Sequence, residues 1–262
     1  MRARRLWLLG DRGDGDDSQQ VWEMNAGGAF APAPFNPQFG SVTPQIFNTA
    51  ATTVSVTKPA CVVSDRLVLY LNRSSASTDL ITPDAAWTAL DTSGLTGSAS
   101  SFCRAYYQDV TAGNIGTATA EFAGGTSTLS TSLVVKYTGC DPSVAPVANG
   151  VAQGSNTTTV DPAALTGPNA GAVQRNLWFT YVGTSSQDTT LGATPAVTVF
   201  PTGYGDTGTS TTTDVSTTAG CGQGWGSKVA TAGSDDPSAW TYCPTGTGRA
   251  LAITVAVRGV IG

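Results

Sequence analysis

Hydrophobic and polar residues alternate along much of this chain with a period of two. In the clearest run, Leu251, Ile253, Val255 and Val257 share one parity, and smaller or polar residues take the other. The same alternation recurs at residues 53–57, 129–137, 177–181 and 197–199. Strict alternation is typical of antiparallel strands that bury one face. The pattern therefore predicts several half-buried strands.

Residues 67–71 are apolar on both parities, which predicts a central strand. Clusters of Gly, Pro, Asn and Asp separate the apolar runs and act as turns. Many short strands with regular turn signals indicate a sandwich or a barrel. We predict an all-β fold, an antiparallel, jelly-roll-like β-sandwich over residues 41–262. One helical turn is expected at Asp161-Pro162, because Asp caps helices well and Pro suits the first helical position.

Parts of the second half echo the first at a constant spacing. Thr111-Ala112-Gly113 recurs as Thr231-Ala232-Gly233, and residues 133–137 match residues 253–257 in the same register. Upstream, Trp87 corresponds to Tyr204, because each follows a similar short segment that ends in proline.

These echoes indicate a candidate internal duplication with halves at about 41–148 and 149–262. Repetition of small residues also arises by chance in a chain rich in Thr and Ala. Two real copies would form either one pseudo-symmetric sandwich or two domains. One sandwich is favoured, because a half on its own would expose much of its sheet.

The first 40 residues differ from the rest in composition. Residues 29–37 contain three prolines, which exclude a regular helix or a central strand. We interpret residues 1–40 as an extended arm that anchors the protein to a partner, and we expect no secretory signal in it. Its apolar side chains are the predicted partner interface: Leu6, Trp7, Leu8, Leu9, Trp22, Phe30, Phe35 and Phe39.

The composition limits the kinds of catalytic and binding site that the chain can form. The 262 residues include no histidine, 12% are charged, and the formal net charge is −5. Histidine is the usual general base and the commonest metal ligand, so we expect no catalytic site, metal or cofactor. The 13 Lys and Arg residues are scattered, so we expect binding to neither nucleic acid nor membrane. The only glutamates, Glu23 and Glu121, leave little scope for a two-carboxylate polysaccharide hydrolase.

Five cysteines are widely spaced, at positions 61, 103, 140, 221 and 243. An odd count at such spacing does not indicate a disulfide framework, so buried free thiols are expected. A Cys221–Cys243 or Cys103–Cys140 bridge stays open if the fold brings either pair together.

Aromatic residues are the remaining candidates for ligand binding, because exposed rings can stack on sugar faces. Trp225 lies in the glycine-rich segment 221–226, which we interpret as a loop, and is the aromatic residue most expected near the surface. Trp225 and Tyr204 are the predicted glycan contacts.

Several segments resemble a motif set found in virion proteins of tailed bacteriophages, especially those of actinobacteria. They are residues 56–60 with 65–70, residues 81–88, residues 106–113 and residues 134–142. The family has glycine where this chain has Ser64, before Asp65, and again where it has Ala86, before Trp87. The resemblance covers about residues 50–262.

The resemblance implies a non-enzymatic structural component of a virion. The first expectation is a minor tail or tail-tip protein anchored by its arm. The alternatives are a head (capsid) decoration protein and a carbohydrate-binding module that recognises a host surface glycan. Other virion proteins are the expected partners of a chain that assembles in the host cytoplasm. A homo-oligomer is expected, with a trimer as the first choice, because such components follow the symmetry of the particle.

Overall fold

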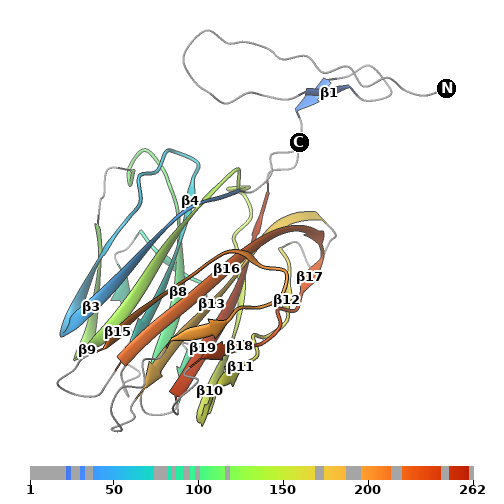
Figure 1. Cartoon of the computed structure of the whole chain (residues 1–262). Helices are drawn as coiled ribbons and strands as arrows, with labels where there is room; N and C mark the ends of the chain where they lie inside the picture. Colours follow the sequence, from blue (N-terminus) through green and yellow to red (C-terminus); the bar gives the residue numbers. More distant parts are fainter. Residues whose placement is uncertain are drawn as a thin grey trace.

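A computed structural model describes residues 22–24, 30–32, 38–73, 82–83, 86–90, 95–97, 101–115, 119–168, 174–186, 196–213, 220–242 and 248–259. Within these ranges every regular element is a β-strand, and every strand pairing is antiparallel (Figure 1). The predicted all-β antiparallel sandwich is confirmed. The predicted helical turn at Asp161-Pro162 is wrong, because residues 161–164 form an irregular link between two short strands.

The first sheet comes from the first half of the sandwich and is drawn in blue to green (Figure 1). Its strands follow the order β3 (Gln38–Thr57), β9 (Thr119–Thr138), β4 (Arg66–Arg73), β8 (Ser101–Asp109) and β6 (Thr88–Ala89). Two further short strands join it: β5 (Thr82–Pro83) pairs with β9, and β7 (Leu95–Gly97) pairs with β8.

The second sheet comes from the second half, drawn in yellow-green to red (Figure 1). Its order is β10 (Val147–Thr157), β19 (Gly248–Arg258), β13 (Gln174–Ser186), β16 (Gly220–Ala232) and β15 (Gly205–Thr213). A three-stranded sheet contains β11 (Thr159–Val160), β18 (Trp240–Tyr242) and β14 (Val197–Val199). Two pairs complete the described strands: β12 (Leu165–Thr166) with β17 (Ser234–Asp235), and β1 (Trp22–Met24) with β2 (Phe30–Pro32).

The two large sheets have the same strand order, and their central strands pair in the same register. In each, the first strand in chain order pairs with the last, the last with the second, and the second with the one before the last, which is β8 or β16. Val68 pairs with Val135 in the first sheet, where Phe179 pairs with Val255 in the second. Equivalent residues of β9 and β19 are therefore 120 residues apart, which is also the spacing of the sequence echoes.

The correspondence extends to the outer faces of the sheets. Val56 at the end of β3 lies opposite Ala120 of β9, and Val160 of β11 lies opposite Trp240 of β18. Both valines are fully buried. The short strands β5 and β14 flank these pairs in the same way. Each large sheet thus carries a small three-stranded cover on its outer face.

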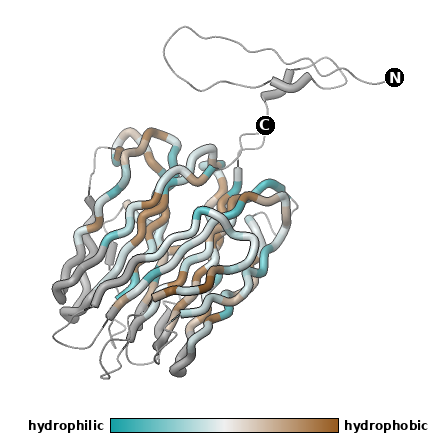
Figure 2. Tube along the Cα trace, viewed as in Figure 1, coloured by the Kyte–Doolittle hydropathy of each residue, from teal (hydrophilic) through white to brown (hydrophobic). Residues whose placement is uncertain are grey.

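One hydrophobic core joins the inner faces of the two sheets. Tyr70 of the first sheet stacks on Phe179 and Tyr181 of the second, with ring centroids 5.2 and 4.6 Å apart. Leu133 and Val135 of β9 belong to the same buried cluster. Hydrophobic residues recur along β4, β13 and β19 (Figure 2). Because the core draws on both sheets, the two halves form a single sandwich.

A buried polar contact fixes the position of one sheet on the other. Asn72 of β4 is fully buried, and its Nδ2 donates to the backbone oxygens of Thr184 and Gly222, each at 3.1 Å. Gly183 lies directly against this side chain. A Cβ atom at Gly183 would sit 2.8 Å from Asn72 Cγ, so only glycine permits this close approach.

The two sheets are arranged with approximate two-fold symmetry. The edge strand β3 contacts β15, and its equivalent in the second sheet, β10, contacts β7. Near the ends of β9 and β19, Cys140 and Gly259 form an antiparallel bridge. Beside it, the Asp141 amide donates to the Arg258 carbonyl at 3.0 Å.

Candidate functional site

A polar latch holds the loop after β8 against the first sheet. Lys58 Nζ donates to Gln108 Oε1 at 3.3 Å and to the Asn114 carbonyl at 3.0 Å. Gln108 Nε2 in turn donates to the Ala86 carbonyl at 3.3 Å. Lys58 and Gln108 are both buried, so these hydrogen bonds satisfy polar groups that water does not reach.

The second sheet has a latch at the equivalent place. Lys228 takes the position of Gln108, and its ammonium binds the Asp235 carboxylate. The Tyr204 hydroxyl donates to the other oxygen of the same carboxylate, and the ammonium lies 4.7 Å from the Tyr204 ring centroid. Burial, and then the hydrogen bond to Asp235, raise the pKa of Tyr204 above its usual value. The phenol therefore stays protonated and acts as a structural donor.

The Arg66 side chain fills the space between the two layers at the edge of the sandwich where β4 begins. The Arg66 side chain is 1% exposed, and its Nε lies 2.6 Å from Asp109 Oδ1. Its Nη1 donates to the Val144 carbonyl at 2.8 Å, and the guanidinium lies 5.6 Å from the Tyr107 ring centroid. This edge of the sandwich is closed by a charge-assisted, stacked contact.

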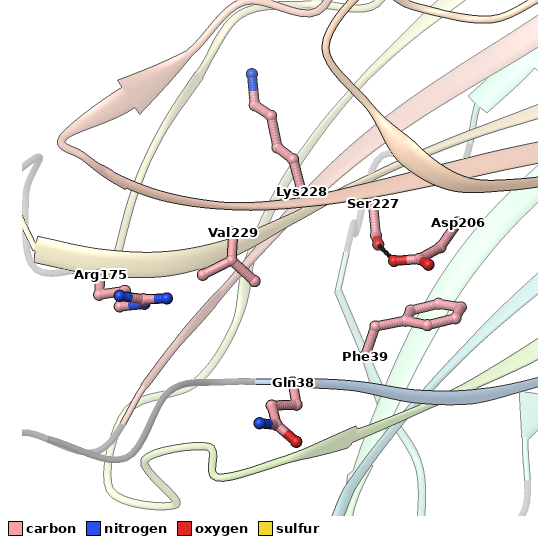
Figure 3. Close-up of a pocket in the computed structure, with 7 residues that line it drawn as sticks. All are labelled: Gln38, Phe39, Arg175, Asp206, Ser227, Lys228 and Val229. Atoms are coloured by element: carbon pink, nitrogen blue, oxygen red, sulfur yellow. Dashed lines mark hydrogen bonds between the residues drawn. The ribbon is translucent and has the colours of Figure 1, made fainter. Parts of the chain in front are cut away.

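The equivalent edge in the second half of the sandwich, where β13 begins, is open. By strand register, Leu177 takes the position of Arg66, Ser227 that of Tyr107 and Val229 that of Asp109. A hollow of about 310 Å³ remains there. Its lining residues are Gln38, Phe39, Arg175, Asp206, Ser227, Lys228 and Val229 (Figure 3).

The side chains around this hollow differ in how firmly they are held. The Phe39 ring stacks on Phe179 with centroids 6.1 Å apart. Ser227 Oγ donates to Asp206 Oδ2 at 2.8 Å, which orients that carboxylate (Figure 3). The Lys228 side chain points away from the other labelled residues, towards its latch (Figure 3). Gln38 and Arg175 line the hollow and are both exposed.

The predicted arm residues fall mostly outside the described structure. Leu6, Trp7, Leu8, Leu9 and Phe35 lie outside the described residues.

Trp22 and Phe30 belong to β1 and β2, which pair with each other in antiparallel orientation. Phe39 is not an arm residue, because β3 begins at Gln38 and the Phe39 ring packs on the sandwich core. The sandwich thus begins at residue 38, three residues before its predicted start at residue 41.

The two predicted glycan contacts lie on different sides of the second sheet. Trp225 is 6% exposed and belongs to the core between the sheets, so the expectation of a surface position is wrong. A ring covered to this extent cannot stack on a sugar. Tyr204 is half-buried on the outer side, where its hydroxyl is bound to Asp235. The structure does not bring the two rings together.

The four described cysteines carry thiols and form no disulfide with one another. Cys103, Cys140 and Cys221 are buried, Cys61 is half-buried, and Cys243 lies outside the described residues. Burial raises the pKa of Cys140 to about 12, so this thiol is inert at neutral pH.

The described part of the chain holds neither a cluster of metal-ligating side chains nor a helix that could span a membrane. There, no three Cys, Asp or Glu side chains are grouped so that they could hold a metal ion. Over the same ranges, no helix has the length and apolarity that a membrane span needs.

Comparisons with protein-family models, with curated proteins and with solved structures find no match to this chain.

Proposed function

We propose that this protein is a non-enzymatic structural component of a tailed-phage virion, most simply a minor tail or tail-tip protein carried by its N-terminal arm. The observation that carries the proposal is the backbone at Ser64, where the phage motif has glycine. Ser64 has a φ of 80°, a conformation that favours glycine. The backbone at Ser64 thus adopts a conformation that a glycine at this position would favour, which supports the resemblance.

Other positions of the motif also form turns or pack in the core. Asp65 Oδ2 accepts a hydrogen bond from the Val62 amide at 2.8 Å and closes the turn before β4. Gly139, in the last motif segment, has a φ of 66°. Trp87 is 6% exposed and packs on the outer face of the first sheet. These roles support a motif that builds a scaffold, which fits a protein whose task is to pack and present a surface.

In this proposal the partners are other virion proteins, and the chain forms a homo-oligomer, with a trimer as the first expectation. Assembly takes place in the host cytoplasm. The arm supplies the attachment and the sandwich supplies the exposed body.

Immunogold electron microscopy of purified particles tests the proposal. Particles are prepared from cells that carry the genome encoding this chain, and the antibody is raised against residues 38–262. Label at the tail supports the minor tail assignment, and label over the head replaces it with a decoration protein. Intact particles without label, from cells that make the chain, contradict a virion role.

Deletion of the arm sharpens the same test. The deletion should end at residue 37, because removing Phe39 would also remove its stacking on Phe179. The shortened chain is expected to keep its unfolding midpoint and to be absent from particles. Normal incorporation of the shortened chain would contradict anchoring by the arm.

A further inference from the structure

We propose that the hollow beside Phe39, Asp206 and Val229 binds one pyranose ring of a neutral glycan. This inference goes beyond the proposed function, since a scaffold needs no ligand. It also places the sugar away from Trp225 and Tyr204.

The first line of support is the contrast with the equivalent edge of the first sheet. There, Arg66, Tyr107 and Asp109 fill the space with a guanidinium that is almost fully buried. In the second sheet, smaller or apolar residues take all three positions and leave a hollow of about 310 Å³. The central strands keep the same order and register, whereas β15 has a bulge between Gly205 and Gly208 that contains Asp206. The smaller or apolar side chains and this bulge together leave the space open.

The second line of support is the balance of charge. Asp206 and Arg175 both line the hollow and are exposed. The third charged lining residue, Lys228, turns its ammonium outward to Asp235. One carboxylate and one guanidinium leave no net charge. This favours a neutral ligand over a phosphate or a lone cation, either of which would leave one group unpaired.

The third line of support is the mixture of surfaces. A pyranose has apolar C–H faces and hydroxyl groups that both donate and accept hydrogen bonds. Phe39 and Val229 provide apolar surface, and Val229 is 41% exposed. Asp206 accepts, Arg175 donates, and the Gln38 amide does both. The volume lies at the small end of ligand sites, which suits a single ring.

Part of the site is already organised. The Phe39 ring is held by Phe179, and the Asp206 carboxylate is oriented by Ser227 Oγ at 2.8 Å. Groups held before the ligand arrives lose less freedom when it binds. Single-ring sugars in shallow sites form few contacts, so a Kd of roughly 1 mM is expected.

Nuclear magnetic resonance titration of the full chain tests the proposal. The probes are the methyl α-glycosides of glucose, galactose and mannose, and N-acetylglucosamine. At least one probe should shift the amide signals of Phe39, Ser227 and Val229. Asp206→Asn and Arg175→Gln should each weaken that binding about tenfold. Asp161→Asn, an exposed carboxylate in the link after β11, is the matched control and should change nothing.

A second variant separates loss of binding from loss of fold. Ser227→Tyr introduces the residue that the first sheet has at this position, so its ring should occupy the hollow and abolish the shifts. The unfolding midpoint should stay near that of the parent chain.

Absence of shifts with all four probes overturns the proposal, as does binding that survives both Asp206→Asn and Ser227→Tyr. Shifts of the same amides on raising the protein concentration without sugar would show that a second copy occupies the hollow, which also overturns it. Particle labelling is unaffected by any of these results, so failure here is distinguishable from failure of the virion role.

Discussion

The two halves of the sandwich share strand order, register and outer covers, yet they close their edges differently. The first half buries Arg66 between its layers, with Asp109 and the Val144 carbonyl as partners. The second half has Leu177 at that position and leaves an open hollow. The comparison teaches that the shared backbone does not depend on the arginine contact. One edge can be closed for stability while its equivalent is released to present side chains to solvent.

The largest expected effect comes from the contact between Asn72 of the first sheet and Gly183 of the second. In Gly183→Ala, the new Cβ would lie 2.8 Å from Asn72 Cγ. The Asn72 side chain is buried, and its hydrogen bonds to the carbonyls of Thr184 and Gly222 hold it in place. Overpacking at such a site should lower the free energy of unfolding by about 3 kcal/mol. Denaturant unfolding measures the change.

Gly113→Ala is the matched control for that variant. Gly113 is exposed in a turn, and a Cβ atom there meets only Thr111 Oγ1 at 3.8 Å. Its effect should stay within about 0.5 kcal/mol. Equal effects of the two substitutions would show that the Asn72–Gly183 contact does not hold the sheets together.

An intermediate effect is expected when the first half is given the residue of the second. Arg66→Leu removes the contacts to Asp109, Val144 and Tyr107 and should cost roughly 2 kcal/mol of stability. The loss is below that of a fully buried pair, because Asp109 is 37% exposed and can be rehydrated. Thermal and denaturant unfolding give the value. Arg175→Leu, at an exposed position of the second half, should change stability little, and a similar cost there would remove the distinction between the two edges.

The smallest effect concerns Asp141, which links the halves. Hydrogen bonds from Ser143, and then the nearby Arg258, lower the pKa of Asp141 below its usual value. A lowered folded-state pKa gives stability that is present above the unfolded pKa of about 4 and lost as the pH falls further. Unfolding between about pH 5 and pH 2 should therefore show a slightly steeper loss in the parent chain than in Asp141→Asn. The difference should be below about 1 kcal/mol, since Arg258 Nε lies 3.7 Å from Asp141 Oδ2, which is too long for a hydrogen bond, and identical pH profiles would contradict it.

The alternation of residues predicted the strands, but its clearest run, in β19, is buried on both faces and not on one. Its larger residues lie in the core between the sheets, and its smaller residues lie under the outer covers. The run at residues 251–258 lies within β19, and residues 67–71 lie in β4 with every residue buried. The prediction of a loop at the glycine-rich segment 221–226 was wrong. It was based on composition, and the segment forms part of β16. Its glycines also alternate, on the face under the outer cover. A Cβ at Gly224 would lie 2.9 Å from Val197 Cγ2. A period of two among glycines was thus the signal of a strand with close neighbours.

The hollow had no comparable signal in the sequence. Its lining comes from β3 at the start of the sandwich and from β13, β15 and β16 in the second half. Its openness depends on which residues face each other across the two layers, and that information exists only once the strands are in register. The Trp225 ring, by contrast, was misplaced for a local reason, because its strand was interpreted as a loop.

The short link between the two large sheets has a consequence for how the sandwich assembles. β9 ends at Thr138 and β10 begins at Val147. A short link therefore joins the first sheet to the second, and each sheet covers the apolar face of the other. Two separate half-length chains would have to meet by diffusion, and their association would weaken on dilution. When the two halves are joined in one chain, the effective concentration of one half at the other is of the order of millimolar. The pairing of the sheets is therefore fixed at one to one and does not depend on how much protein a cell makes.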